Sequence, residues 1–82
     1  MNLEVLKDAE WLAEYEEAVG MLKAIKEAGS AVVLDFEGFS VALPLNAEIK
    51  KLIEKLEQMV GKRIAILRTD LLNKPYLVRE VK

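Results

Sequence analysis

The chain has 82 residues, 52% of them hydrophobic and 32% charged, and it contains neither cysteine nor histidine. This length predicts one small domain over residues 1–82. Without cysteine there is no disulfide or thiolate metal site, and without histidine the usual zinc ligand and the usual general base are missing. We therefore expect no metal, no cofactor and no enzymatic activity.

The formal net charge of −2 is unevenly distributed along the chain. Residues 62–82 contain six basic side chains against two acidic ones, whereas the residues before them are acidic overall. No apolar run approaches the roughly 20 residues of a membrane-spanning helix, and the N-terminus lacks the basic start of a secretion signal. We expect a cytoplasmic protein with no membrane partner. Its charged, cysteine-free composition leans towards that of thermophile proteins.

The first predicted element is a helix that begins near Asn2 or Asp8 and ends at Ala28. Asp8 is expected to cap its start and Gly29 to end it in a left-handed conformation. Residues 3–7 either extend this helix or form an extended arm. Gly20 indicates close approach of another backbone, or is simply tolerated. The apolar residues recur at the helical spacings of three and four: Trp11, Tyr15, Ala18, Leu22 and Ile25.

Residues 31–43 predict a β-hairpin with a two-residue turn at Glu37-Gly38. Side chains alternate between the faces of a strand, so a slip of one residue would scatter the large apolar side chains over both faces. The pattern therefore predicts the register as well as the strands. The expected cross-strand pairs are Phe36 with Phe39, Leu34 with Val41, and Val32 with Leu43.

The second half of the chain predicts another helix and another pair of strands. Pro44 ends the hairpin, Asn46 caps a helix over residues 47–60, and Gly61 ends that helix. Residues 63–68 and 76–81 then read as two strands joined by a turn. The order α-β-β-α-β-β predicts an α+β two-layer sandwich. In it, two helices cover one face of a four-stranded, mainly antiparallel sheet.

The uncovered second face of this predicted sheet is small and apolar, and it suits packing against another sheet. We therefore expect a non-enzymatic interaction module that acts as a homodimer. The residues predicted to form this dimer or partner surface are Ala31, Val33, Ala42, Ala65 and Leu67.

The alternative is a small nucleic-acid-binding protein that uses its basic C-terminal hairpin. Arginine and lysine contact phosphates, and a tyrosine among them can stack on a base. Charged residues are also common at strand edges, where they prevent aggregation, and a pI of about 5.2 is low for a nucleic-acid binder. The residues predicted for this interface are Arg63, Arg68, Lys74, Tyr76 and Arg79.

Overall fold

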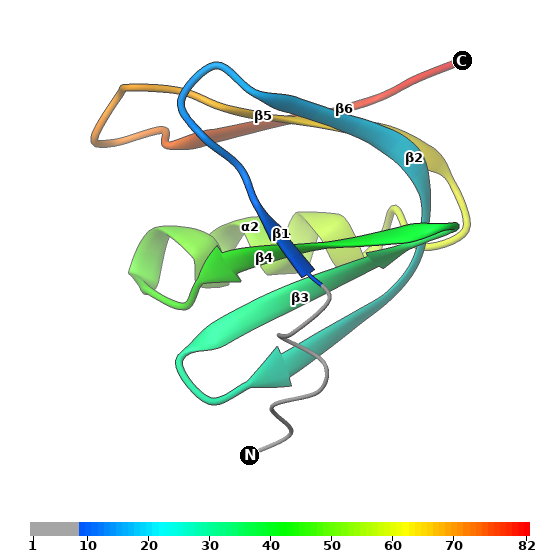
Figure 1. Ribbon diagram of the computed structural model, residues 1–82, viewed down its shortest axis with the longest axis horizontal. Helices are drawn as coiled ribbons and strands as arrows, with labels where there is room; N and C mark the ends of the chain where they lie inside the picture. Colours follow the sequence, from blue (N-terminus) through cyan, green and yellow to red (C-terminus); the bar gives the residue numbers. More distant parts are fainter. Residues whose placement is uncertain (1–8) are drawn as a thin grey trace.

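One long strand, β2 (Glu17–Ala28), organises the fold. Its first half, residues 17–21, pairs with β5 (Arg63–Arg68), and its second half pairs with β3 (Ala31–Phe36). A register shift between Leu22 and Ala24 separates the two halves. A bulge of this kind adds a residue to one strand and bends it. In the computed structural model, which describes residues 9–82, β2 accordingly curves from one half of the sheet into the other (Figure 1).

The sheet has six strands in the order β1-β4-β3-β2-β5-β6 and forms a half-barrel. All neighbouring strands are antiparallel except β1, which runs parallel to β4. Three strands follow as hairpins and β5 returns beside the first of them, which is a Greek key. The remaining elements are β1 (Ala9–Trp11), β4 (Phe39–Pro44), the helix α2 (Ala47–Glu57) and β6 (Tyr76–Glu80).

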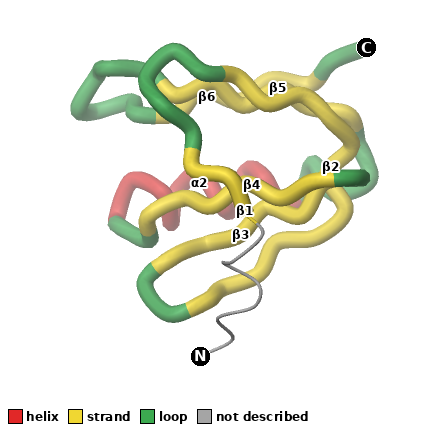
Figure 2. The backbone as a smooth tube through the Cα atoms, viewed as in Figure 1, coloured by secondary structure: helices red, strands yellow, loops and turns green. Residues whose placement is uncertain are grey.

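The core lies between α2 and both halves of the bent sheet (Figure 2). Ile49 and Leu56 of α2 are buried in one cluster with Leu22 of β2. The same cluster contains Val32, Leu34 and Leu43 from one half of the sheet and Ile64 and Ile66 from the other. Burial of these side chains is what holds the two halves around the helix.

The predicted α+β sandwich of a four-stranded sheet and two helices is wrong, because residues 17–28 form a strand. The bulge explains the misleading pattern. Ala18 and Leu22 point to the core before it and Ile25 after it, so the spacing becomes four and then three residues, as in a helix. Helix propensity is a weak preference that pairing on both sides overrides. The predicted start at Asn2 or Asp8, and residues 3–7, lie outside the described residues.

Most of the remaining elements were predicted correctly. The first hairpin has the expected pairs, with Phe36 opposite Phe39, and Gly38 has a positive φ in its turn. Asn46 caps α2 by accepting a hydrogen bond from the Ile49 backbone N–H at 2.9 Å, although the helix ends at Glu57 rather than at residue 60. Both C-terminal strands are present. Gly29 is left-handed as expected, but in the turn between β2 and β3.

Among residues 9–82 there is no helix long and apolar enough to cross a membrane.

Gly20 lies two residues before the bulge in β2, and its close neighbours are aromatic rings rather than a second backbone. A Cβ atom there would lie 3.0 Å from the Phe39 ring and 3.3 Å from Phe36, two rings that stack with centroids 4.8 Å apart. We expect Gly20→Val to lower the free energy of unfolding by about 1–3 kcal/mol, because the stacked rings must move. Urea unfolding followed by circular dichroism measures this. Met21→Val, on an exposed neighbouring position, should change it by less than about 0.5 kcal/mol. Equal midpoints for Gly20→Val and the parent would contradict this account.

Candidate functional site

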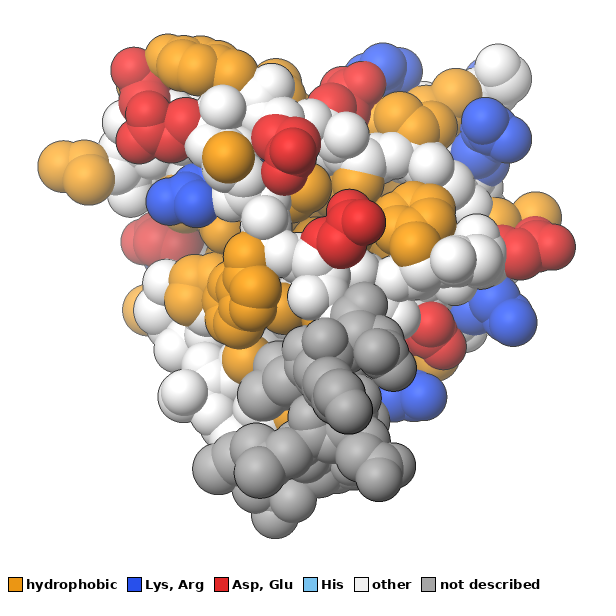
Figure 3. All heavy atoms as spheres, viewed as in Figure 1, with side chains coloured by type: hydrophobic (Ala, Val, Ile, Leu, Met, Phe, Trp, Pro, Cys, Tyr) orange, Lys and Arg blue, Asp and Glu red, His pale blue; other side chains and the backbone are white. Residues whose placement is uncertain are grey.

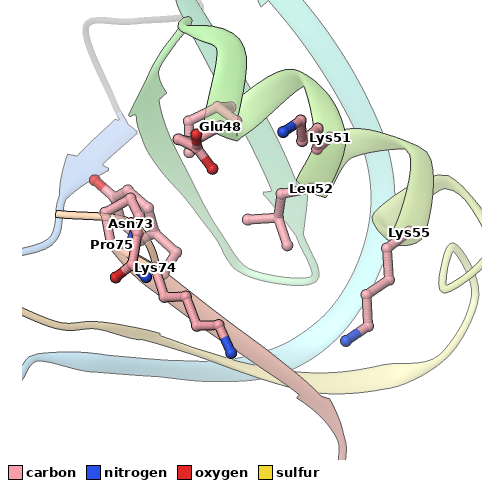
Figure 4. Close-up of a pocket in the computed structure, with 9 residues that line it drawn as sticks. Glu48, Lys51, Leu52, Lys55, Asn73, Lys74 and Pro75 are labelled. Atoms are coloured by element: carbon pink, nitrogen blue, oxygen red, sulfur yellow. The ribbon is translucent and has the colours of Figure 1, made fainter. Parts of the chain in front are cut away.

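A cleft lies between α2 and the segment that enters β6 (Figure 4). Its volume is about 240 Å³. In Figure 4, Leu52 and Lys55 project from α2, while Lys74 extends from the opposite wall. The lining residues are Glu48, Ile49, Lys51, Leu52, Lys55, Asn73, Lys74, Pro75 and Tyr76.

The helical wall follows from the spacing of residues in α2. Lys51 and Leu52 follow Glu48 by three and four positions, and Lys55 follows them by four and three, so all four lie on one side of the helix. The adjoining face is fixed by the burial of Ile49 and Leu56 in the core, which leaves the lysine face at the border of the cleft.

The opposite wall is shaped by Thr69, a polar residue buried at the end of β5. Its hydroxyl donates a hydrogen bond to the Lys74 carbonyl oxygen at 2.5 Å and accepts one from the Leu71 N–H at 3.1 Å. The Thr69 N–H donates to the Pro75 carbonyl oxygen at 2.8 Å. These bonds close the loop 70–75 onto the strand and hold Lys74 and Tyr76 in position.

The cleft is basic although the chain as a whole is acidic. Three lysines and one glutamate line it, whereas the net charge of the chain is −2. Tyr76 is half-buried at its side, and burial raises the pKa of its phenol, an effect that Arg68 partly opposes. The phenol therefore stays neutral at physiological pH and can donate a hydrogen bond through its O–H. The cleft can bind an anionic group beside an aromatic one.

A second hollow of about 260 Å³ adjoins this cleft and shares Glu48, Pro75 and Tyr76 with it. This second hollow is acidic rather than basic, because the carboxylates of Glu14 and Asp70 line it together with that of Glu48. The remaining lining residues are Pro44, Asn46, Arg68, Thr69, Leu71 and Leu72.

The structure divides the five residues predicted for nucleic-acid binding. Lys74 and Tyr76 line the basic cleft. Arg68 donates from Nη1 to the Leu12 carbonyl oxygen at 2.6 Å, which commits its guanidinium to the loop before β2. Arg63 and Arg79 lie on the outer face of the sheet, where Arg79 Nη2 is 3.8 Å from Glu17 Oε2. The five therefore do not form one surface.

The residues predicted for a dimer surface are mostly buried within the chain. Ala31, Val33, Ala42 and Ala65 have exposed fractions between 0% and 4%, and Leu67 is half-buried. Ala65 lies on the central strand of a triplet, with Val19 and Arg79 beside it in register. These residues form no free face in this structure, and homodimerisation stays a prediction.

Lys51 and Lys55 were missed because a helical pattern only divides a helix into a core face and a polar face. Which part of the polar face borders another element depends on where the chain returns. The spacing of Lys51 and Lys55 in the sequence shows that they share one face of α2. No local sequence pattern shows that this face lies opposite Lys74.

No group of three or more aspartates and glutamates within residues 9–82 is placed to hold a metal ion. Comparison with protein-family models, with curated proteins and with solved structures finds no match for this chain.

The role of Thr69 gives a prediction for the wall of the cleft. We expect Thr69→Val to lower the free energy of unfolding by about 1–3 kcal/mol, because the Lys74 carbonyl and the Leu71 N–H each lose a partner. Urea unfolding measures the loss, and amide chemical shifts in residues 70–76 should change most. Thr69→Ser keeps the hydroxyl and should recover most of the stability. Equal free energies of unfolding for Thr69→Val and Thr69→Ser would show that the hydroxyl does not hold this loop closed.

Proposed function

We propose that this protein is a non-enzymatic binding module that takes single-stranded nucleic acid into the basic cleft between α2 and residues 73–76. The observation that carries the proposal is that Lys51, Lys55 and Lys74 line one cleft together with Tyr76. Lysines near phosphates release condensed counterions, and aromatic rings stack on bases of any sequence. Single-strand binders combine these two features.

The dimensions of the cleft favour part of a chain over an enclosed small molecule. Pockets that enclose drug-sized ligands usually measure about 300–1,000 Å³. At about 240 Å³, this cleft fits one unit of a longer ligand, with the neighbouring units outside it. Half-burial of Tyr76 leaves part of its ring available for stacking.

The architecture supports the proposal by analogy alone. Small, partly open Greek-key barrels include modules that bind oligonucleotides through strands and adjoining loops. Here the sheet is also an incomplete barrel, and the loop before β6 forms one wall of the cleft. Fold does not determine function, so the proposal rests on the charge and shape of the cleft.

This proposal replaces the arginine hairpin with the lysine cleft as the binding surface. Arg63 and Arg79 face away from the interior, and Arg68 is held by a carbonyl group. Changing Arg63 and Arg79 to Gln together should therefore leave binding nearly unchanged. A large loss in that variant would support the hairpin surface instead.

The lysines provide the first test, by fluorescence anisotropy with a labelled twelve-nucleotide oligo(dT) at several salt concentrations. We expect the triple variant Lys51→Gln, Lys55→Gln, Lys74→Gln to bind at least tenfold more weakly at low salt. The slope of log affinity against log salt should fall by about 2, since each lost phosphate contact removes roughly 0.7.

The control is the triple variant Lys23→Gln, Lys26→Gln, Lys50→Gln, which changes the net charge equally at positions outside the cleft. It should keep most of the affinity. Equal losses in the two triple variants, or no salt-dependent binding by the parent, would refute the lysine cleft. Free thymidine monophosphate added as a competitor separates binding of a lone phosphate from binding of a chain.

Tyr76 provides the second test in the same assay. Tyr76→Phe keeps the ring and should bind within about threefold of the parent, whereas Tyr76→Leu should lose about 5- to 150-fold, the equivalent of one stacked base. Equal affinities of the Phe and Leu variants would show that no base stacks there. Unfolding midpoints of both variants verify that the fold is kept.

A further inference from the structure

Two loops meet at one end of the molecule, beside the basic cleft. They are residues 12–16, between β1 and β2, and residues 69–75, between β5 and β6. The Tyr15 N–H donates to the Arg68 carbonyl oxygen at 2.7 Å, and the Arg68 N–H donates to the Glu16 carbonyl oxygen at 3.1 Å. We call this surface the acidic–apolar end, and its residues are Glu14, Tyr15, Asp70, Leu71 and Leu72.

Large apolar side chains protrude here. Leu72 is 97% exposed, Tyr15 65% and Leu71 52%, and Leu72 is the most exposed large hydrophobic residue in the part of the chain that the structure describes. Figure 3 shows hydrophobic side chains among acidic ones at the upper left, where these loops lie in Figure 1. Clustered exposed apolar side chains rimmed by polar ones are typical of interaction surfaces.

The backbone beneath these side chains is held in place. Tyr15 has a φ of 64°, in the left-handed region that residues other than glycine rarely adopt. The Ala13 N–H donates to Glu16 Oε1 at 3.1 Å, and Thr69 anchors the other loop. A hydrogen bond to Asp70 is the main reason that the pKa of the Tyr15 phenol is raised. Surfaces fixed in advance lose less conformational entropy on binding.

The charge of this end specifies its partner. Glu14, Glu48 and Asp70 line the hollow of about 260 Å³ together with Leu71 and Leu72, against one cation, Arg68, so the hollow stays acidic. Residues 9–17 contain four glutamates and no lysine or arginine. Anionic lipid and nucleic-acid phosphates are repelled here, whereas a lysine or arginine side chain is attracted.

We propose that the acidic–apolar end docks a segment of another protein in which a lysine or arginine stands beside a large apolar residue. The basic side chain enters the hollow against Glu14 and Asp70, and the apolar residue packs on Leu71 and Leu72. These few residues are far fewer than the roughly 20–30 that each side contributes to a standard protein interface, so the contact is of the weak, peptide-recognition kind.

The test is selection of a random twelve-residue peptide library, displayed on phage, against the full chain. The synthetic peptide of the consensus sequence is then titrated by fluorescence anisotropy. We expect enriched peptides to contain lysine or arginine next to Leu, Ile, Phe or Trp. Leu72→Ser should weaken the consensus peptide about tenfold or more, and Asp70→Asn should weaken it severalfold with a flatter salt dependence. Leu72 is almost fully exposed, so its replacement leaves the fold intact.

Val60→Ser, at an apolar residue that is 44% exposed elsewhere on the surface, is the matched control and should leave peptide binding unchanged. The triple lysine variant of the basic cleft should also keep it, which separates this proposal from the nucleic-acid proposal. No enrichment, acidic consensus peptides, or equal binding by Leu72→Ser and Val60→Ser would each overturn the proposal. Amide shift changes confined to α2 on adding the consensus peptide would also overturn it.

Discussion

The bend in β2 is the constraint on which the rest of the structure depends. Because one strand pairs with β5 through its first half and with β3 through its second, the two halves of the sheet turn around it instead of lying flat. The bulge at Leu22 and Ala24 supplies the bend, and Gly20 gives the Phe36 and Phe39 rings room beside it. The concave side then needs a cover, and α2 supplies it with Ile49 and Leu56. The cleft lies where α2 faces the segment that enters β6.

Sequence reasoning predicted the elements whose local signals agree with one another. In β3 and β4 the alternation, the turn at Gly38 and the bulk of Phe36 and Phe39 all favour one register, and that register is present. In α2 the Asn46 cap and the apolar spacing agree as well. In β2 they conflict. Its residues favour helix and its bulge imitates helical spacing, so only pairing with strands distant in sequence determines its structure.

The candidate site was less predictable, because it depends on which distant residues meet. Side chains alternate between the two faces of β5, so Arg63 and Arg68 lie on opposite faces of the sheet. Their closeness in the sequence therefore did not indicate a shared binding surface. Tyr76 and Lys74 were singled out for phosphate and base contacts, and both line the cleft. Their partners Lys51 and Lys55 come from α2. Bringing them together requires the whole half-barrel, and no spacing within either segment encodes it.

The two neighbouring hollows differ in charge but share one wall. Pro75 and Tyr76 lie between a basic cleft and an acidic hollow, and Glu48 borders both. Under the two proposals, an anionic ligand would fill the first and a cationic segment the second. Because the two hollows share Glu48, Pro75 and Tyr76, the two ligands would be neighbours, and their charges would interact. Opposite charges on the two ligands attract, so each lowers the free energy of binding the other, and this coupling is reciprocal.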